Sequence, residues 1–251
     1  METGSQSRAK HRARRAGRIA WALLSGFVVE SVVFGLSVLP AVLFWEWHFG
    51  WRIAPSWLRI VVLSMSFVPA HLLFALGLMV CSALAMRLVG WRTPPNAEMR
   101  IADLDWPLLR WARYLASAHL VRLFAGALFR ATPVWTFYHR LNGARMGRRV
   151  YVNSLAVMDD NLLEFDDGVV IGHGVHLSGH TVEGEVVKTA PVRLGRNVTI
   201  GVSSVVGIDV EIGSDTTVGA LSVVPKHERL AAGAVYGGVP VRRLDAAEAP
   251  R

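Results

Sequence analysis

The chain has 251 residues, and 52% of its side chains are hydrophobic, with a positive mean hydropathy. This balance exceeds that of an ordinary soluble protein and indicates membrane segments. The net charge of +8 does not require a nucleic-acid partner, because much of it lies in an N-terminal leader that contains Arg8, Lys10, Arg12, Arg14, Arg15 and Arg18. A single cysteine, Cys81, excludes a disulfide framework and a zinc site made of thiolates.

The first 92 residues combine a polar leader with two apolar stretches. Residues 1–17 are basic, and we expect them to be disordered. The stretches at about 19–45 and 60–86 are each long enough to cross a bilayer, which takes about 20 helical residues. The link between them is rich in tryptophan, as is typical of a membrane–water boundary: Trp45, Trp47, Trp51 and Trp57. The sequence therefore predicts a two-span transmembrane α-helical hairpin over residues 18–92.

Positive charge is unequal on the two sides of this hairpin. It lies before the first span and again after the second, at Arg87, Arg92 and Arg100. The link holds only Arg52 and, at its edge, Arg59. By the positive-inside rule both termini face the cytoplasm. We expect a multi-pass protein of the cell (inner) membrane, in contact with membrane lipids.

Residues 93–140 predict an interfacial or linker helix. Asp105 is a plausible N-cap, with Pro107 in the first turn and Pro133 as the residue that ends the helix. The stretch from residue 105 to residue 130 is rich in tryptophan, leucine and arginine, which suits a helix at the membrane surface. A core helix packed on the domain that follows is the alternative.

Residues 194–225 repeat with a period of six. An aliphatic residue opens each unit, at Leu194, Ile200, Val206, Ile212, Val218 and Val224, and glycine follows each of the first five. This period fits neither a helix nor a hairpin. It predicts a parallel β-helix with triangular coils of three units each. We expect the aliphatic residues to point inward and the glycines to supply the backbone conformations of the corners.

The repeat also extends backwards along the chain. Counting in sixes from Leu177 gives Ile171, Phe165 and Asp159 as openers. Because the interval from Leu177 to Leu194 falls one short of three full units, the segment between them should leave the coil as a loop. Past Lys226 the chain should fold back over the last coil. These patterns place a β-helix at residues 141–244 and a tail at 245–251.

Several segments resemble a known family. GVHLSGH, PVRLGRNVTIG and the ending SVVPK…GGVPVRRL are similar to hexapeptide-repeat acyltransferases with a left-handed β-helix. A closer resemblance, from about Leu123 to Leu244, is to the membrane-embedded terminal domain of stand-alone non-ribosomal peptide synthetases of the poly-lysine synthase type. Those proteins carry several transmembrane helices and three tandem β-helix units, so this chain looks like one unit fused to two spans. The resemblance implies a homotrimer with active sites in the clefts between the prism-shaped β-helices of neighbouring subunits.

The resemblance puts His180 on the family's catalytic position, as a general base. A histidine suits this role because its pKa lies near neutrality. His180 also opens the expected loop, where functional residues concentrate; the alternative is a histidine that only hydrogen-bonds its neighbours. Coils of three full units would stack Asp160 and Asn161 beside it, where either could orient the imidazole, unless they form only a turn. Glu183 is a weaker candidate.

Two further histidines raise the possibility of a metal. His173 and His176, together with His180, could form a three-histidine zinc site. Their spacing within one coil does not match the ligands of β-helix zinc enzymes, which come from different coils and chains. We therefore expect no metal, with His176 pointing outward near the cleft.

The resemblance also implies a place for the thioester donor. In the family the pantetheine arm bonds backbone amides along the prism edge, and the matching positions are Gly201, Val202, Gly219 and Ala220, with Lys226 near a phosphate. Pro225 stands where the family often has a threonine, which weakens the coenzyme A contact.

These observations predict a membrane-anchored acyltransferase. It would move an acyl group, with acetyl favoured, from acetyl-CoA or another acyl-CoA to a hydroxyl or an amine. One alternative is amide-bond formation from an aminoacyl thioester on a phosphopantetheinyl carrier protein, supplied in trans by a synthetase. Another is a trimerising scaffold without catalysis.

Overall fold

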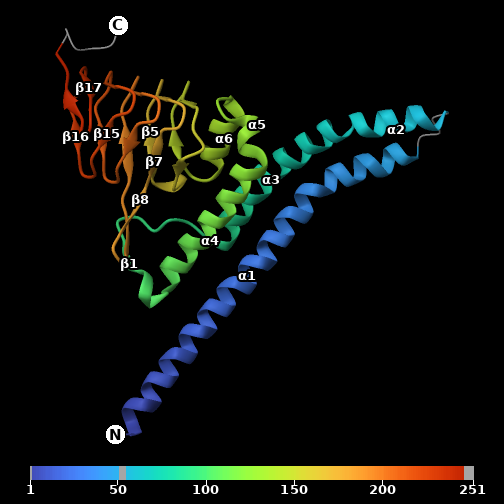
Figure 1. The fold of residues 1–251 in the computed structure, drawn as a ribbon, viewed down its shortest axis with the longest axis horizontal. Helices are drawn as coiled ribbons and strands as arrows, with labels where there is room; N and C mark the ends of the chain where they lie inside the picture. The colour runs from blue at the N-terminus through green and yellow to red at the C-terminus, as the bar shows by residue number, and fades with distance from the viewer. Residues whose placement is uncertain (1, 51–54, 246–251) are drawn as a thin grey trace.

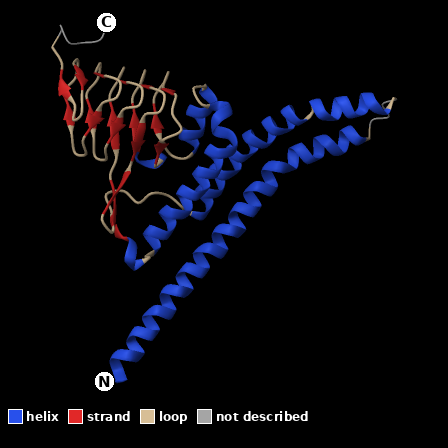
Figure 2. Ribbon diagram, in the orientation of Figure 1, coloured by secondary structure: helices blue, strands red, loops and turns tan. Residues whose placement is uncertain are grey.

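The computed structural model describes residues 2–50 and 55–245, with side chains from residue 12 onward, and has three parts (Figure 1). A helical arm runs along one side, a parallel β-prism lies on the other, and a helical layer lies between them (Figure 2). Trp51 and Arg52, which the sequence places in the link, and most of the tail fall outside the described residues.

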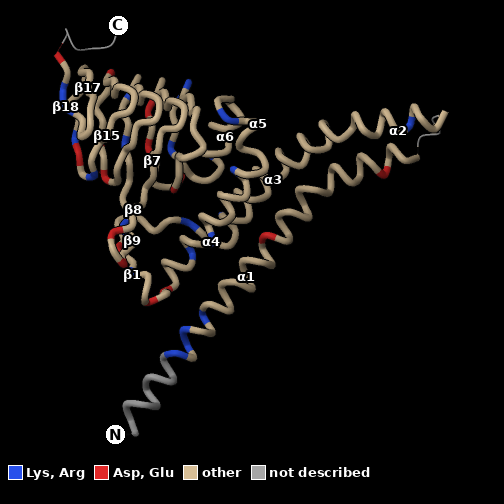
Figure 3. Tube along the Cα trace, in the orientation of Figure 1, with Lys and Arg blue, Asp and Glu red and all other residues tan. Residues whose placement is uncertain are grey.

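The helical arm consists of α1 (Glu2–Phe49), α2 (Ser56–Met65) and α3 (Phe67–Val89), with α1 packed along α3. Two stretches, Arg12–Phe49 and Ser56–Val89, are long and apolar enough to cross a membrane. The second is interrupted at Ser66, because Pro69 has no N–H for the carbonyl four residues earlier. Lys and Arg lie towards the N-terminal end of α1 and beyond α3, whereas the arm between them carries few charges (Figure 3).

The N-terminal leader is helical in the structure, whereas the sequence predicts that it is disordered. Because α1 begins at Glu2, the structure places residues 2–17 in helix. The leader is rich in alanine and arginine, and both are good helix formers, so it can extend the helix that follows.

The helical layer contains α4 (Trp106–Val121), the π-helical turn η2 (Arg122–Gly126), α5 (Ala127–Phe129) and α6 (Pro133–Leu141). Asp105 occupies the N-cap position of α4 but makes no side-chain cap; its carboxylate pairs with Arg18 of α1 instead, at 2.6 Å. The expectation that Pro133 ends a helix is wrong. Pro133 begins α6, where Thr132 accepts a hydrogen bond from the backbone of Trp135.

This layer packs as a core rather than lying free on a surface. α4 contacts α1 and α3, and α6 contacts α3 and the first strands of the prism. Tyr114, Trp135 and Tyr138 are almost completely buried between these elements. The alternative of a core helix therefore describes α4 and α6 better than a purely interfacial helix.

The prism is built from three parallel sheets, with strand orders β16-β13-β10-β5-β2, β17-β14-β11-β6-β3 and β15-β12-β7-β4. Its strands are β2 (Arg145–Met146), β3 (Tyr151–Val152), β4 (Val157–Met158), β5 (Leu163–Phe165), β6 (Val170–Ile171), β7 (His176–Ser178), β10 (Val192–Leu194), β11 (Thr199–Ile200), β12 (Val205–Val206), β13 (Glu211–Ile212), β14 (Thr217–Val218), β15 (Val223–Val224), β16 (Arg229–Leu230) and β17 (Val235–Gly237). Leu194 pairs with Ile212, which opens the third unit after it, and all six predicted openers are buried. Past Lys226 the parallel coil continues through β16 and β17, contrary to the expectation that the chain folds back there, and only β18 (Arg242–Arg243) folds back, antiparallel to β17.

The repeat glycines act differently from the expectation. Left-handed backbone falls on the fourth residue of each unit, with φ of 54–65° at Asn197, Ser203, Asp209, Asp215, Leu221 and His227. The glycines at the second position are needed for space. A Cβ on Gly201 would lie 2.4 Å from the amide nitrogen of Ala220, and one on Gly213 would lie 2.5 Å from that of Ala232. Glycine therefore permits neighbouring coils to approach closely.

The segment between Leu177 and Leu194 leaves the prism as predicted, but as a β-hairpin rather than an irregular loop. β8 (His180–Glu183) and β9 (Val186–Thr189) pair antiparallel, and β1 (Glu98–Arg100) adds a third strand. Met99, Leu108 and Val187 form a small buried cluster beneath this sheet. The hairpin thereby ties the prism to the segment that precedes α4.

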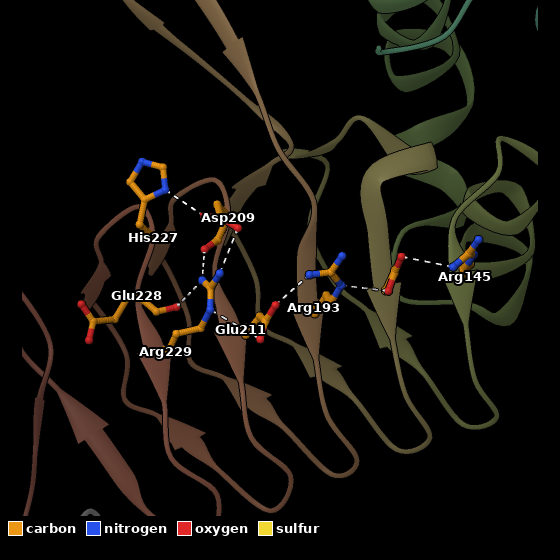
Figure 4. Close-up of polar contacts among 8 residues, drawn as sticks. Arg145, Arg193, Asp209, Glu211, His227, Glu228 and Arg229 are labelled. Atoms are coloured by element: carbon orange, nitrogen blue, oxygen red, sulfur yellow. Dashed lines mark hydrogen bonds and ion pairs between the residues drawn. The ribbon is translucent and has the colours of Figure 1, made fainter. Parts of the chain in front are cut away.

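One face of the prism carries a ladder of alternating charges (Figure 4). Arg193 of β10 pairs with Glu164 of β5 at 3.1 Å and with Glu211 of β13 at 2.7 Å. Arg145 and Arg229 extend the ladder at its two ends. Opposite charges on adjacent strands favour this stacking of coils.

Candidate active site

His180 and Asp159 form a hydrogen-bonded pair beside the hairpin. His180 follows β7 and opens β8, whereas Asp159 follows β4. Nδ1 of His180 lies 2.5 Å from Oδ2 of Asp159, whose side chain is fully buried, while that of His180 is 15% exposed. Within the described part of the chain, Nε2 of His180 has no hydrogen bond. The ring is thus held through one nitrogen, and the other stays available.

Two side chains hold Asp159 on its other oxygen. Thr93 donates its hydroxyl to Oδ1 at 2.6 Å, and the indole N–H of Trp111 donates to the same atom at 3.3 Å. The Trp111 ring also packs edge-on against His180, with centroids 5.1 Å apart. The segment after α3 and the helix α4 therefore support the pair.

The sequence predicts Asp160 or Asn161 as the partner of His180, and the structure corrects this. β4 pairs with β7 through Val157 and Leu177, which lie further apart in the chain than three full units. The short 3-10 helix η3 (Asp160–Leu162) follows β4, and Asp159 precedes it with a left-handed φ of 62°. This local insertion shifts the register, so Asp159 faces His180.

Asp160 belongs to a second, buried pair. Its Oδ1 lies 2.6 Å from Nδ1 of His139 in α6, and both side chains are fully buried. Tyr114 donates its hydroxyl to Oδ2 of Asp160 at 3.0 Å. Burial first, and then the Asp160 and Asp159 carboxylates, raise the pKa of Tyr114 well above its usual value, so the hydroxyl stays protonated as a donor. His139 had no signal in the sequence beyond being a histidine in the segment that leads into the prism.

Asn161 supports the wall of the site. Its amide nitrogen donates to the carbonyl of Thr93 at 2.8 Å, and its side-chain oxygen accepts from the Thr93 amide at 3.2 Å. Because Thr93 in turn binds Asp159, Asn161 is joined to the pair through Thr93 and makes no hydrogen bond to His180 within the described residues.

The other histidines of the described residues are not arranged as a set of metal ligands. In the described part of the chain, no group of three His, Cys, Asp or Glu side chains is placed to hold one. His176 is exposed on β7, as predicted. Partial burial first, and then the neighbouring His180, lower the pKa of His176.

The predicted donor positions lie along one corner of the prism, on the third and fourth coils. The amides of Gly201 and Gly219 already donate to the carbonyls of Val218 and Tyr236 on the next coil, at 2.8 and 2.7 Å. Those two amides are therefore already used in the backbone hydrogen bonds between neighbouring coils. Val202 and Ala220, which follow these glycines, are exposed.

Lys226 lies at the next corner, after β15, which is the corner where the hairpin leaves the prism after β7. Its amine pairs with Glu183, which also pairs with Lys188 at 3.2 Å. The hydrogen bond from Lys226, followed by that from Lys188, lowers the pKa of Glu183. Because Glu183 and His180 are the two ends of β8, this strand connects the predicted phosphate contact to the predicted base.

No family model matches the chain. The Delta-poly-L-ornithine synthetase of Acinetobacter baumannii (strain AB307-0294) is 23% identical over 176 residues; the match covers 68% of this chain but only 13% of that protein. A galactoside acetyltransferase in complex with coenzyme A is 29% identical, with a TM-score of 0.35, over 41% of this chain and 55% of that one.

A hexapeptide-repeat acetyltransferase from Vibrio cholerae O1 biovar eltor, complexed with acetyl coenzyme A, is 23% identical, with a TM-score of 0.38, over 41% of this chain and 60% of that one. The two solved structures named here are acetyltransferases, one of them described as a hexapeptide-repeat protein, and the synthetase is a curated protein similar to part of this chain.

Proposed function

We propose that this chain is an acyltransferase in which His180 is the general base. Nε2 of His180 takes the proton of an acceptor hydroxyl or amine as that group attacks an acyl thioester, and the thiolate leaves. Asp159 holds Nδ1 and stabilises the imidazolium that forms. The observation that carries this proposal is the 2.5 Å contact between His180 and a fully buried Asp159.

For the donor we favour acetyl-CoA or another acyl-CoA. The exposed corner at Val202 and Ala220 offers a path for a pantetheine arm, and Lys226 offers a cation for a phosphate. A phosphate would replace Glu183 as the partner of Lys226, an exchange that is cheap because both side chains are partly exposed to water.

We further propose a left-handed coil and a homotrimer. The charge ladder satisfies one face of the prism internally, which suits contact with water. The corner between the other faces instead exposes apolar side chains: Val202 at 48%, Leu221 at 72% and Val239 at 71%. A second copy covering this corner would also close a cleft next to the donor positions.

The helical arm is proposed to anchor the protein in the inner membrane, with both termini cytoplasmic. Its large apolar side chains are widely exposed, for example Leu23 at 70%, Phe27 at 72% and Leu88 at 88%. A core helix of a soluble protein would bury such residues, whereas lipid tails accept them. The arginines at the start of α1 and after α3 fit the cytoplasmic side.

A second candidate is amide-bond formation from an aminoacyl thioester on a carrier protein. The similarity to a synthetase favours it, although the match covers only 13% of that protein. The base and the direction of proton transfer would be the same, with an amine as acceptor. A carrier protein or synthetase in trans would then be a partner.

The variant His180→Ala in the purified full chain tests both candidates. We expect label transfer from radioactive acetyl-CoA to a membrane extract, or from an aminoacyl carrier protein to amines, to fall about 10²–10⁴-fold. His173→Ala is the matched control, since His173 is exposed and lies outside the pair. Equal transfer by His180→Ala would exclude His180 as the base. A folded wild-type trimer that transfers nothing from either donor would favour the scaffold.

A further inference from the structure

A cleft lies where the C-terminal end of α3, the helix α4 and the first coil of the prism meet. Its volume is about 640 Å³. The buried residues Trp91, Tyr114 and Leu162 contribute to its lining. Four arginines and no acidic residue line the same cleft: Arg87, Arg92, Arg110 and Arg145. We call it the arginine cleft.

Two of these guanidinium groups are uncommitted. Arg92 and Arg110 are exposed, and neither forms a hydrogen bond or ion pair within the described part of the chain. The arginines of the charge ladder differ, because Arg193 and Arg229 each bind carboxylates. The positive charge in the arginine cleft is therefore not balanced by the cleft's own lining.

The other two arginines are held only weakly. Arg87 donates to the carbonyl of Arg140 at 3.2 Å, which leaves its charge unneutralised. Arg145 contacts Glu164 at 3.3 Å, but its side chain is 82% exposed, so this pair is worth little. Like charges gathered around one cavity repel each other, and an anion between them would remove that repulsion.

We propose that the arginine cleft binds the phosphate group of an anionic ligand, as a phosphate monoester or a diphosphate. The planar fork of a guanidinium matches phosphate oxygens and forms strong, charge-assisted pairs with them. Several arginines around one cavity suit the two or more negative charges of such a group better than the single charge of a carboxylate.

The position of the cleft sets the possible sources of the phosphate. It adjoins the end of α3, where the arm would leave a bilayer, so the head group of a membrane amphiphile is one source and a soluble phosphate is the other. The cleft lies at the first coil of the prism. The corner with the predicted donor positions, Val202 and Ala220, lies on the third and fourth coils, and the second coil, which ends at His180, lies between the two. Asn161 lines the cleft and is joined through Thr93 to Asp159. A ligand held there would therefore border the supports of the proposed base.

The test measures binding and does not depend on acyl transfer. The full chain is purified in neutral detergent and titrated with inorganic pyrophosphate, and separately with mixed micelles that contain phosphatidic acid or phosphatidylcholine. The double variant Arg92→Gln/Arg110→Gln removes the uncommitted charges. Arg148→Gln/Arg243→Gln is the matched control, because both arginines are exposed and lie outside the cleft lining.

We expect pyrophosphate or phosphatidic acid to bind, and phosphatidylcholine not to. The cleft variant should weaken binding roughly tenfold or more, because hydrogen bonds to charged groups are lost, while the control should not change it. The thermal midpoint of the cleft variant without ligand should not fall below that of the wild type, since neither side chain makes an internal bond and the repulsion among the four arginines is reduced. Tighter binding of phosphatidic acid than of pyrophosphate would identify a lipid head group, and the reverse a soluble phosphate.

Two results would overturn the assignment. These are no binding of either probe, and equal binding of a probe by the cleft variant and the wild type. A wild type that binds phosphate but transfers no acyl group would leave the cleft intact and count only against the proposed function.

Discussion

Asp159 and Asp160 are neighbours in the chain, yet their carboxylates bind two different histidines, His180 and His139. The left-handed backbone at Asp159 and the 3-10 turn that follows separate the two side chains. One pair is partly exposed beside the hairpin, and the other is fully buried under α6. The same short segment thus serves the proposed chemistry and the packing of the helical layer.

Asp159→Asn should reduce turnover with little change in KM. An amide in place of the carboxylate can no longer stabilise an imidazolium, and it accepts the Nδ1–H less well. The loss in kcat should be on the order of 10²–10⁴-fold. Steady-state kinetics with the wild type's own acceptor measures it. An unchanged kcat, with the thermal midpoint also unchanged, would remove Asp159 from the mechanism.

Asp160→Asn should act on stability. The amide leaves His139 and Tyr114 without their carboxylate partner, and weakening hydrogen bonds to a buried charged group costs about 1.5–3 kcal/mol of unfolding free energy. Glu164→Gln is the control, because its ion pairs are exposed and contribute about 0–1 kcal/mol. Denaturant unfolding in detergent measures both variants. Similar losses of unfolding free energy in the two variants would show that the buried pair contributes no more to stability than the exposed ion pairs do.

Gly213→Ala should disrupt the stacking of the coils. The added Cβ would lie 2.5 Å from the amide nitrogen of Ala232, so a coil must shift, at a cost of about 1–3 kcal/mol. Gly35→Ala in α1 is the contrast, since nothing lies within 4 Å of its added Cβ and alanine favours helix. The two thermal midpoints should move in different directions. A harmless Gly213→Ala would contradict the role of glycine as a spacer.

His180→Gln should raise the pKa of His176. Partial burial, and then His180, hold that pKa below its usual value, and the substitution removes the second cause. Because the folded-state pKa is lowered, the stability linked to neutral His176 is present above the pKa of the unfolded chain. It is lost as the pH falls through the folded pKa. Histidine-labelled NMR titration of both proteins checks the shift, and an unchanged value would show that the two rings do not interact.

Arg193→Glu should weaken the charge ladder. It would place three carboxylates in a row, at residues 164, 193 and 211, and like charges on adjacent strands oppose pairing by about 0.2–1 kcal/mol for each contact. The double variant Arg193→Glu/Glu211→Arg restores one alternating pair and should recover part of the loss. Because the groups are partly exposed, the difference should shrink in high salt. A loss that does not depend on salt would point to packing instead.

The sequence determined the prism, because its period is local. Each unit places one aliphatic residue inward, and a slip of one residue would expose the whole row, so six openers such as Leu194 and Ile212 could be identified without a structure. The two long apolar stretches of the helical arm, and the segment that leaves the prism after Leu177, could also be predicted from the sequence. The role of the glycines was not, because a clash between coils depends on atoms of the next coil, such as those that Ala232 brings against Gly213.

The partner of His180 was decided only by the tertiary structure. Counting by three units assumes regular coils, and the short turn at Asp160–Leu162 lengthens this coil in a way that no periodicity reveals. Tyr114, Trp111 and His139 reach the two aspartates from helices outside the repeat, so their contacts have no sequence spacing to predict them. Repetition fixes what lies one coil away, whereas contacts between non-repeating elements depend on how whole helices pack.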